Sequence, residues 1–430
     1  MKKYYFLGVG GISMSALAIL SKAKGIDVSG YDAKRSENVK MLKRHGICVD
    51  TRFVREHIDG CDVVVFSSAI KSGNIVFDYA KSSHKEMFSR GEFLGMLSRD
   101  YENVIAVAGS HGKTTTTAMI YEILKSAGKN PTLHLGGLLV ENGENFAIGS
   151  NKYFVTEACE YCDNFLCLNP TISVVTNIEK EHMDYFKNFK NQILSFEKFK
   201  KLSRYVVDNC EDYEVKNLSH DSDGKLKFSL YFQKIHIFDL KLQICEEINA
   251  QNCIFAYKVA KKMGISDNQI KEGLENFCGV KKRFEIVSAK DFPNVICDYA
   301  HHPTEIDKVF ESARNIYKGK KIVSIFQPHT YSRTKNLLNE FVDVFSKTDY
   351  AIFYKTYSAR EKETDGFNSY YLMKKCKKNG TNSFYFHSIC EMILFLKKFF
   401  RGENFVLLFI GAGDLPELLK KVKFLSDGGK

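Results

Sequence analysis

The chain has 430 residues, of which 44% are hydrophobic and 26% are charged, a composition that excludes a disordered or fibrous protein and provides for two or three domains. Lysine and arginine exceed aspartate and glutamate by 62 − 51 = 11, and no block of five or six like charges occurs. This excess suits an anionic ligand and does not by itself indicate nucleic-acid binding.

The start of the chain predicts a cytoplasmic protein. A charged dipeptide leads directly into a strand-like run at residues 4–7, so we expect no signal peptide, and no apolar stretch of 18 residues follows that could insert into a membrane. Twelve cysteines are too dilute for a disulfide scaffold and would be reduced there. The one cluster, Cys159, Cys162 and Cys167, lacks a second ligand pair at zinc-site spacing, so we expect buried thiols.

Short apolar runs alternate with helical patterns along the whole chain, which predicts an α/β fold with mostly parallel sheets. Three blocks can be drawn, residues 1–101, 102–281 and 282–430, and we expect each to form a domain. The expected strands are residues 4–7, 27–29 and 63–67, then 104–108, 153–156 and 172–176, then 295–297, 321–326, 350–354 and 405–410. The polar stretch 208–247 predicts a small sheet or a long surface excursion.

A glycine-rich loop follows the first expected strand. Gly8, Gly10 and Gly11 precede Ser13, which stands where a dinucleotide-binding fingerprint has its third glycine. A loop of this kind holds a phosphate-bearing ligand at the N-terminus of the next helix. Both NAD and a UDP-sugar fit this pattern.

Two further features of the first block would lie near that loop. Asp32 closes the next strand, as an acidic residue does in the fingerprint. Ser67 and Ser68 follow a later strand and would lie at the carboxyl edge of the sheet, where ligands of open α/β sheets bind. A turn or a helix cap is an equally good interpretation of the two serines.

A second loop has the residue order of a phosphate-binding loop. After the buried-type strand at residues 104–108, it reads Gly109, Ser110, His111, Gly112, Lys113, Thr114 and Thr115. A strand, a glycine loop and a helix in this order direct backbone N–H groups at one place. Lys113 would bring a cation to the β- and γ-phosphates, and the Thr114 hydroxyl can hold Mg²⁺. The alternative is an ordinary strand-to-helix turn, but packing alone does not explain Gly-Lys-Thr at a helix start.

A carboxylate and an imidazole follow later strands of the same block. Glu157 comes directly after residues 153–156, and His182 lies a few residues after 172–176, so both should reach the sheet edge that carries the phosphate loop. Together they would bind a second Mg²⁺ between the γ-phosphate and an acceptor. Glu160 and Asp184 lie nearby in the sequence, and we expect them to be solvated loop charges.

Polar clusters also follow two strands of the third block. His301 belongs to the cluster at residues 298–305, and Arg333 belongs to the cluster at residues 327–333. Two such clusters at consecutive strand ends predict a binding edge for a second substrate, with Arg333 as the partner of a carboxylate.

Taken together, these motifs resemble the Mur ligases of peptidoglycan synthesis. The resemblance runs nearly end to end, through residues 8–15, 67–70, 109–117, 157–161, 176–179 with His182, Asn249 and Asn252, 279–284, 298–305, 326–334 and 358–361. The set in this order is far more specific than any one of its motifs.

The resemblance implies a Rossmann-like N-terminal domain for a UDP-sugar, a central P-loop ATPase domain and a Rossmann-like C-terminal domain for an amino acid. The implied reaction is the ATP-dependent joining of L-alanine to UDP-N-acetylmuramate through an acyl phosphate, with two Mg²⁺ ions. The implied roles are γ-phosphoryl stabilisation by Lys113, one Mg²⁺ at Thr114, a second at Glu157 and His182, adenine contact by Asn249 and Asn252, and orientation of alanine by His301 and Arg333.

Three alternatives remain at this point. A relative in the same family would attach a whole peptide in cell-wall recycling, but the run at residues 11–14 favours the alanine reaction. An NAD-dependent oxidoreductase would use the first block and leave Lys113 and His182 unexplained. A nucleic-acid-dependent NTPase would need clustered basic runs, which the sequence lacks.

Overall fold

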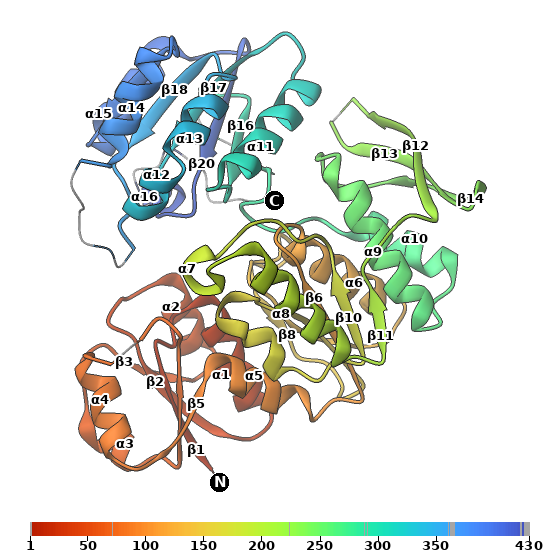
Figure 1. Cartoon of the computed structure of the whole chain (residues 1–430), viewed down its shortest axis with the longest axis vertical. Coiled ribbons are helices and arrows are strands. Elements are labelled where there is room, and N and C mark those ends of the chain that lie inside the picture. Colours follow the sequence, from red (N-terminus) through yellow and green to blue (C-terminus); the bar gives the residue numbers. More distant parts are fainter. Residues whose placement is uncertain are drawn as a thin grey trace. The chain divides into compact units, whose positions relative to one another are not determined.

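A computed structural model of the chain describes residues 2–70, 72–222, 224–287, 289, 291–359, 361, 366–421 and 424 (Figure 1). Two compact units are formed, the first by Met1–Ser219, Leu226–Ile244 and Ile248–Val280, and the second by His220–Lys225, Cys245–Glu247 and Lys281–Lys430. Arg360, which belongs to one motif of the resemblance, lies outside the described residues. Within the described ranges, no helix is both long and apolar enough to cross a membrane.

The first unit begins with a parallel five-stranded sheet in the order β3-β2-β1-β4-β5. The strands are β1 (Lys3–Leu7), β2 (Asp27–Tyr31), β3 (Cys48–Asp50), β4 (Val63–Phe66) and β5 (Glu86–Ser89), and the helices are α1 (Ile12–Ala23), α2 (Glu37–Arg44), α3 (Arg55–Asp59), α4 (Ile75–Ser82) and α5 (Arg90–Ser98). The strand order reverses between β1 and β4. Ligands of doubly wound sheets bind at such a switch point, and the loops after β1 and β4 are the two that the sequence analysis singled out.

The middle of the chain adds a six-stranded sheet to the same unit, in the order β11-β10-β6-β9-β7-β8. Its strand pairs are parallel except for β7 with β8. The strands are β6 (Asn103–Ala108), β7 (Thr132–His134), β8 (Phe146–Ala147), β9 (Tyr153–Glu157), β10 (Ile172–Val175) and β11 (Tyr205–Val207). The helices are α6 (Lys113–Ser126), the 3-10 helix η1 (Tyr161–Cys167), α7 (Met183–Phe186), α8 (Phe189–Lys201), α9 (Ile248–Lys262) and α10 (Asp267–Asn276).

The polar stretch at residues 208–247 forms a small sheet, as predicted. Its strands, β12 (Tyr213–His220), β13 (Leu226–Phe232) and β14 (Ile235–Lys241), lie in sequence order, and β13 pairs antiparallel with β14. Leu226, Phe228 and Leu230 alternate with more polar residues along β13 and join the core of the middle domain.

The third sheet, in the second unit, has the order β15-β16-β20-β17-β18-β19, and its strands are parallel except for β15. The strands are β15 (Glu285–Ile286), β16 (Val295–Asp298), β17 (Lys321–Phe326), β18 (Tyr350–Tyr354), β19 (Ser383–Phe386) and β20 (Phe405–Ile410). The helices are α11 (Pro303–Ile316), α12 (Tyr331–Asn336), α13 (Leu338–Phe345), α14 (Ser369–Lys378), α15 (Ile389–Phe399) and α16 (Leu415–Lys421). Ile322 and Phe326 of β17 face one core and Val323 and Ile325 face another, so helices cover both faces of the sheet.

One hydrophobic core spans the first and middle sheets. It contains Phe6 and Phe93 from the first domain and Phe154 and Phe199 from the middle domain, all fully buried. A continuous core of this kind resists separation of the two domains, because parting them would expose large aromatic side chains to water. This shared core explains why the two domains form one compact unit.

The structure confirms the predicted α/β class, and every strand predicted from the sequence is present. The sequence analysis did not identify β3, β5, β7, β8, β11, β15 or β19.

Candidate active site

The predicted phosphate loop connects β6 to α6. Gly109 has φ = +138°, and Gly112, the N-cap of α6, has φ = +82°, where glycine is favoured. A Cβ atom on Gly109 would lie 2.1 Å from the Thr176 Oγ1 atom, and one on Gly112 would lie 2.6 Å from the Asn252 Oδ1 atom. Both glycines therefore allow polar side chains from other elements to close around the loop.

The segment after β10 holds this loop in shape. The Ser110 amide donates to the Asn177 carbonyl oxygen at 3.0 Å, and the His111 amide donates to the Asn177 Oδ1 atom at 2.9 Å. The Ser110 hydroxyl accepts from the Glu179 amide at 2.8 Å, and the His111 Nε2 atom lies 3.2 Å from the Glu179 carboxylate. The loop is thus preorganised at a helix N-terminus, whose first N–H groups lack partners within the helix and favour an anion.

Lys113, the first residue of α6, folds back over the loop. Its Nζ atom donates to the Gly109 carbonyl oxygen, to the Ser110 carbonyl oxygen at 3.2 Å and to the Glu160 Oε1 atom at 3.1 Å. Burial lowers the pKa of Lys113, but the carboxylates of Glu160 and Glu181 outweigh it and raise that pKa above its usual value. A permanent positive charge therefore lies beside the phosphate loop.

The expectation that Glu160 is a solvated loop charge is wrong. Its side chain is 1% exposed, and its Oε1 atom lies 3.1 Å from the Lys113 Nζ atom and 3.5 Å from the His182 Nε2 atom. Burial acts to raise the pKa of Glu160, but Lys113 and His182 together lower it to about 2, so the carboxylate stays charged. The side chain of Asp184 lies outside the described part of the chain.

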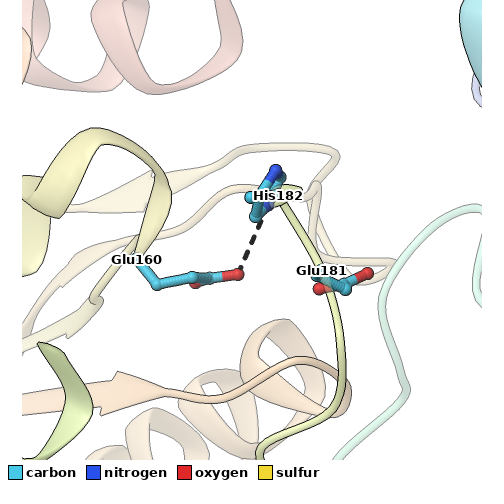
Figure 2. A group of neighbouring side chains, drawn as sticks. All are labelled: Glu160, Glu181 and His182. Atoms are coloured by element: carbon cyan, nitrogen blue, oxygen red, sulfur yellow. Dashed lines mark ion pairs between the residues drawn. The ribbon is translucent and has the colours of Figure 1, made fainter. Parts of the chain in front are cut away.

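Glu160, Glu181 and His182 form the one group in the described residues whose histidine, cysteine or acidic side chains could together hold a metal ion (Figure 2). Their ligand atoms all lie within 4.8 Å of one another. The Glu160 Oε2 atom is buried without a hydrogen-bond partner, and burial raises the pKa of Glu181. A buried oxygen without a partner, beside a second carboxylate and an imidazole, fits a divalent cation of the Mg²⁺ class.

Glu157 lies outside that group, at the end of β9. Its Oε1 atom accepts a hydrogen bond from the Gly136 amide at 2.7 Å. A Cβ atom on Gly136 would lie 2.8 Å from the Glu157 carboxylate, and one on Gly137 would lie 2.8 Å from the Thr114 Cγ2 atom. The turn after β7 therefore runs against both predicted ligands, Thr114 and Glu157. Sequence reasoning missed this turn because β7 is short and only one of its three residues, Leu133, is apolar. Thr115, the next residue of α6, is half-buried.

Asn249 and Asn252 lie on α9, and both side chains are buried. The Asn252 Nδ2 atom donates to the Asn249 Oδ1 atom at 2.9 Å, and the Asn252 amide lies against Gly112. The structure thus brings this pair to the phosphate loop. Their contact with the adenine stays a prediction.

Replacing Gly109 with alanine should damage the nucleotide site. The new Cβ atom would collide with Thr176 and strain the backbone, so we expect KM for ATP to rise about tenfold or more, a loss of ~1.4 kcal/mol in binding. Gly128→Ala is the matched control, because Gly128 also has positive φ, at +70°, but no atom lies within 4 Å of its added Cβ. Steady-state kinetics of both variants check this, and equal KM values would contradict the assigned role of the loop.

The first glycine loop turns tightly between β1 and α1. Gly8 has φ = +76°, and its carbonyl oxygen accepts from the Gly11 amide at 3.1 Å. The Gly10 amide donates to the Asp32 Oδ2 atom at 2.9 Å, so Asp32 holds the loop itself. Ser13 lies in the first turn of α1, and its hydroxyl contacts the middle domain.

Ser67 lies beside this loop. A Cβ atom on Gly8 would lie 3.2 Å from the Ser67 Cβ atom, so the two predicted segments meet at the switch point. The Ser67 hydroxyl accepts from the Ala69 amide at 3.3 Å, which also makes Ser67 the turn residue named as the alternative. Ser68 is half-buried in the same turn.

In the second unit, Asp298 is the last residue of β16, and His301 lies in the loop that follows it. The buried Asp298 carboxylate accepts from the Phe284 amide at 2.7 Å and the Ala300 amide at 2.6 Å. Burial raises the pKa of Asp298 to about 6. The His301 Nδ1 atom lies 3.4 Å from the Glu305 carboxylate, and burial lowers the pKa of His301 to about 4, so its imidazole is neutral.

The two predicted clusters of this unit do meet. The His301 and His329 ring centroids are 6.1 Å apart, and the Arg333 Nη1 atom donates to the His329 carbonyl oxygen at 2.6 Å. In the sheet, however, β20 lies between β16 and β17. The loop after β20 thus belongs to the same edge: a Cβ atom on Gly413 would lie 2.2 Å from the Gln327 Oε1 atom, and sequence reasoning missed this Gly-Ala-Gly turn.

The prediction of three buried thiols is wrong for Cys162. Cys162 is exposed, and Cys159 and Cys167 are half-buried. Cys162 belongs to η1, where it has φ = +55°. The backbone therefore turns sharply at this residue, and the spacing of the cysteines says nothing about that turn.

Three family models match the chain. The Mur ligase family catalytic domain matches residues 3–102, the Mur ligase middle domain matches 107–241, and the Mur ligase glutamate ligase domain matches 282–413. Among solved structures, UDP-N-acetylmuramate-alanine ligase MurC from Thermotoga maritima is similar with a TM-score of 0.85 and 26% identity, covering 98% of each chain. A murein peptide ligase from Psychrobacter arcticus shares the fold, with a TM-score of 0.70 and 21% identity over 98% of each chain.

Curated relatives match over nearly the whole chain. UDP-N-acetylmuramate–L-alanine ligase of Caldicellulosiruptor bescii is 38% identical over 447 residues, which cover 97% of this chain and 98% of that protein. The ligase of the same name from Caldanaerobacter subterraneus is 35% identical over 456 residues, which cover 100% and 98%. On this evidence, and with the phosphate loop and its buried lysine in place, the chain belongs to the Mur ligase family.

Proposed function

We propose that the chain joins the amino group of L-alanine to the lactyl carboxylate of UDP-N-acetylmuramate while ATP is converted to ADP and phosphate. The observation that carries the ATP-dependent step is the phosphate loop with Lys113 folded over it and held by the buried Glu160. The choice of substrates is supported by the names of relatives at 35–38% identity over nearly the full length.

The three sheets would divide the substrates among them. We assign residues 1–101 to the UDP-sugar, 102–281 to ATP and 282–430 to L-alanine. In the first domain, the loops after β1 and β4 lie at the switch point of the sheet and would hold the diphosphate and sugar. The residues assigned to this contact are Gly8, Gly10, Gly11, Ser13, Ser67 and Ser68.

The chemistry needs charge stabilisation and positioning rather than a nucleophilic side chain. A lactyl carboxylate oxygen would attack the γ-phosphorus to give an acyl phosphate and ADP, and the alanine nitrogen would then displace phosphate through a tetrahedral intermediate. Negative charge develops on the γ-phosphoryl oxygens in the first step, and the Lys113 ammonium group would stabilise it. Gly109, Ser110, His111, Gly112 and Thr115 would contribute the loop around the phosphates.

Two divalent cations fit the polar groups of this site. The sequence analysis paired Glu157 with His182, but Glu157 lies outside the group around His182. We therefore assign one ion to Thr114 and Glu157, which flank the Gly136 turn, and a second to His182 with Glu160 and Glu181, which the sequence analysis did not assign. When bound, Mg²⁺ would neutralise charge on the phosphates. The buried, unpartnered Glu160 Oε2 atom supports this assignment.

In the second unit, His301 and Arg333 would orient L-alanine. A neutral imidazole at His301 can accept a hydrogen bond from the alanine amino group, whereas an imidazolium could not. Arg333 offers a guanidinium group, which matches the geometry of a carboxylate. Because both steps use soluble nucleotides, we propose that the enzyme works in the cytoplasm.

The alternatives account for less. A hydride-transferring enzyme would leave Lys113, Glu160 and His182 without a role. A ligase that attaches a whole peptide shares the fold, so the substrate that supplies the amino group must be tested directly.

Phosphate release from ATP and Mg²⁺ tests this function. We expect release to require both UDP-N-acetylmuramate and L-alanine, and to be much slower with D-alanine, glycine, L-serine or L-glutamate. Release with L-Ala-D-Glu-diaminopimelate in place of L-alanine would move the chain to the peptide-ligating branch. Release that ignores the UDP-sugar would contradict the proposal.

A further inference from the structure

A buried histidine joins the first domain to the middle domain, and neither the phosphate loop nor the metal group involves it. His134 is the last residue of β7 and is 2% exposed. Its Nε2 atom lies 2.8 Å from the Ser13 Oγ atom of the first glycine loop region. Its Nδ1 atom lies 2.8 Å from the Thr156 Oγ1 atom on β9, the strand beside β7.

The neighbours of this histidine give each hydrogen bond a direction. The Thr156 hydroxyl donates to the Glu157 carbonyl oxygen at 3.0 Å, so the Thr156 oxygen accepts from the protonated Nδ1 atom of His134. The unprotonated Nε2 atom then accepts from the Ser13 hydroxyl, whose oxygen in turn accepts from the Arg90 Nη1 atom at 3.3 Å. A single directed chain therefore runs from Arg90 to the main chain of Glu157.

This series of hydrogen bonds requires a neutral imidazole at His134, because only the neutral form donates at one nitrogen and accepts at the other. Burial, and then the charge of Arg90, lower the pKa of His134 to about 3. The histidine therefore keeps this form throughout the pH range in which the enzyme would work.

The two ends of this hydrogen-bonded series lie at two different substrate sites of the proposed function. Ser13 belongs to the first turn of α1, at the loop assigned to the UDP-sugar, and the Ile12 carbonyl oxygen beside it accepts from the Asn145 side chain of the middle domain. At the other end, Thr156 precedes Glu157, whose carboxylate is bound by the Gly136 amide, two residues after His134. A shift of Ser13 would therefore move His134, and His134 is linked to Glu157 both through Thr156 and through the Gly136 amide.

We propose that His134 is a positioning residue that couples occupancy of the UDP-sugar loop to the geometry of the ATP site. This inference rests on the proposed function for the identity of the two ligands. The contiguous core beneath the contact makes the two sheets move together, and the hydrogen-bonded chain makes the position of Ser13 dependent on that of Glu157.

The coupling can be measured without catalysis. The probe is the non-hydrolysable ATP analogue adenylyl imidodiphosphate with Mg²⁺, and its Kd is determined by calorimetry with and without UDP-N-acetylmuramate. For the wild-type enzyme we expect tighter binding in the presence of the sugar nucleotide, by a factor of roughly 5 or more. In His134→Leu the factor should fall below about 2, because leucine cannot form the hydrogen bonds that link Ser13 to Thr156.

A matched control and a rescue separate coupling from a merely structural role. His45 also joins the two domains, with its Nε2 atom 3.7 Å from the Glu144 carboxylate and not hydrogen-bonded to Ser13 as His134 is, so His45→Leu should keep the wild-type factor. His134→Gln retains one hydrogen-bond donor and one acceptor and should keep most of the coupling factor. Circular dichroism and thermal unfolding check that each variant is folded.

Several outcomes would overturn the inference. These are a wild-type factor below 2, an unchanged factor in folded His134→Leu, or equal losses in His45→Leu. Should His134→Leu not fold, Thr156→Val removes the hydroxyl that accepts from the His134 Nδ1 atom and must also abolish the factor. Failure of the wild-type enzyme to bind either ligand would instead contradict the proposed function.

Discussion

Replacing Lys113 with alanine should lower sugar- and alanine-dependent phosphate release by a factor of at least about 10³. Lys113 is the one cation that the described structure folds directly over the phosphate loop, where its ammonium group bonds to two loop carbonyl oxygens and to Glu160. Without it, charge that develops on the γ-phosphoryl oxygens would lose its nearest permanent partner. The measurement is kcat for phosphate release at saturating substrates.

A lysine on the same helix provides the control. Lys125 lies in the last turn of α6 and pairs with the buried Glu122 and the exposed Glu141. Lys125→Ala should keep kcat within about twofold of the wild-type value, because Lys125 lies at the end of α6 opposite the phosphate loop. Near-normal kcat in Lys113→Ala would contradict the role of Lys113 and the phosphate loop in phosphoryl transfer.

Glu160→Gln should reduce both stability and activity. The substitution removes the carboxylate that lies 3.1 Å from the Lys113 ammonium group, and loss of one partner of a largely buried ion pair costs about 3 kcal/mol in unfolding free energy. It also removes a ligand from the proposed metal group, so we expect phosphate release to fall at least about 100-fold. Urea unfolding and steady-state kinetics measure the two effects.

The double variant Lys113→Met, Glu160→Gln distinguishes the two causes. It removes both charges, so stability should return towards the wild-type value while activity stays lost.

Glu160→Gln should also change how the stability of the protein depends on pH in the acid range. The folded pKa of Glu160 lies near 2 against an ordinary 4.5, so its stabilising contribution is complete above about pH 4.5 and is lost as pH falls towards 2. Glu160→Gln should lack this loss of unfolding free energy. If wild-type and variant lose the same stability between about pH 4.5 and 2, the ion pair is contradicted.

The sequence predicted the central strands because those strands are buried on both faces. Residues 104–108 and 405–410 are continuous apolar runs for that reason. Most of the missed strands, such as β3, β5 and β11, lie at sheet edges, where one side of the strand meets solvent and the apolar run is short or absent. An edge strand is specified by pairing with its neighbour, which a single-sequence pattern does not contain.

The candidate site was predicted where local sequence order determines it. Gly109, Gly112 and Lys113 follow one strand and begin one helix, so their convergence is a property of one short segment. Glu160 was misjudged because its burial depends on Lys113 and His182, which reach it from distant segments. His134 was not identified, since an isolated histidine at a strand end acquires meaning only through Ser13 and Thr156.

The same limit applies to the second unit. The clusters around His301 and Arg333 follow consecutive strands, β16 and β17, as predicted, but β20, from the end of the chain, lies between these strands in the sheet. The sequence places β20 more than 70 residues after β17, so only the folded sheet shows that its glycine turn joins the edge.

The central claim is that the lactyl carboxylate is activated by phosphoryl transfer and then joined to L-alanine. The most direct measurement uses UDP-N-acetylmuramate labelled with ¹⁸O in that carboxylate, together with ATP, Mg²⁺ and L-alanine, and mass spectrometry of both products. With both carboxylate oxygens labelled, an acyl phosphate predicts one ¹⁸O atom in each phosphate released and an alanine adduct of the sugar nucleotide that keeps the other ¹⁸O atom. Unlabelled phosphate, or labelled phosphate without the alanine adduct, would contradict it.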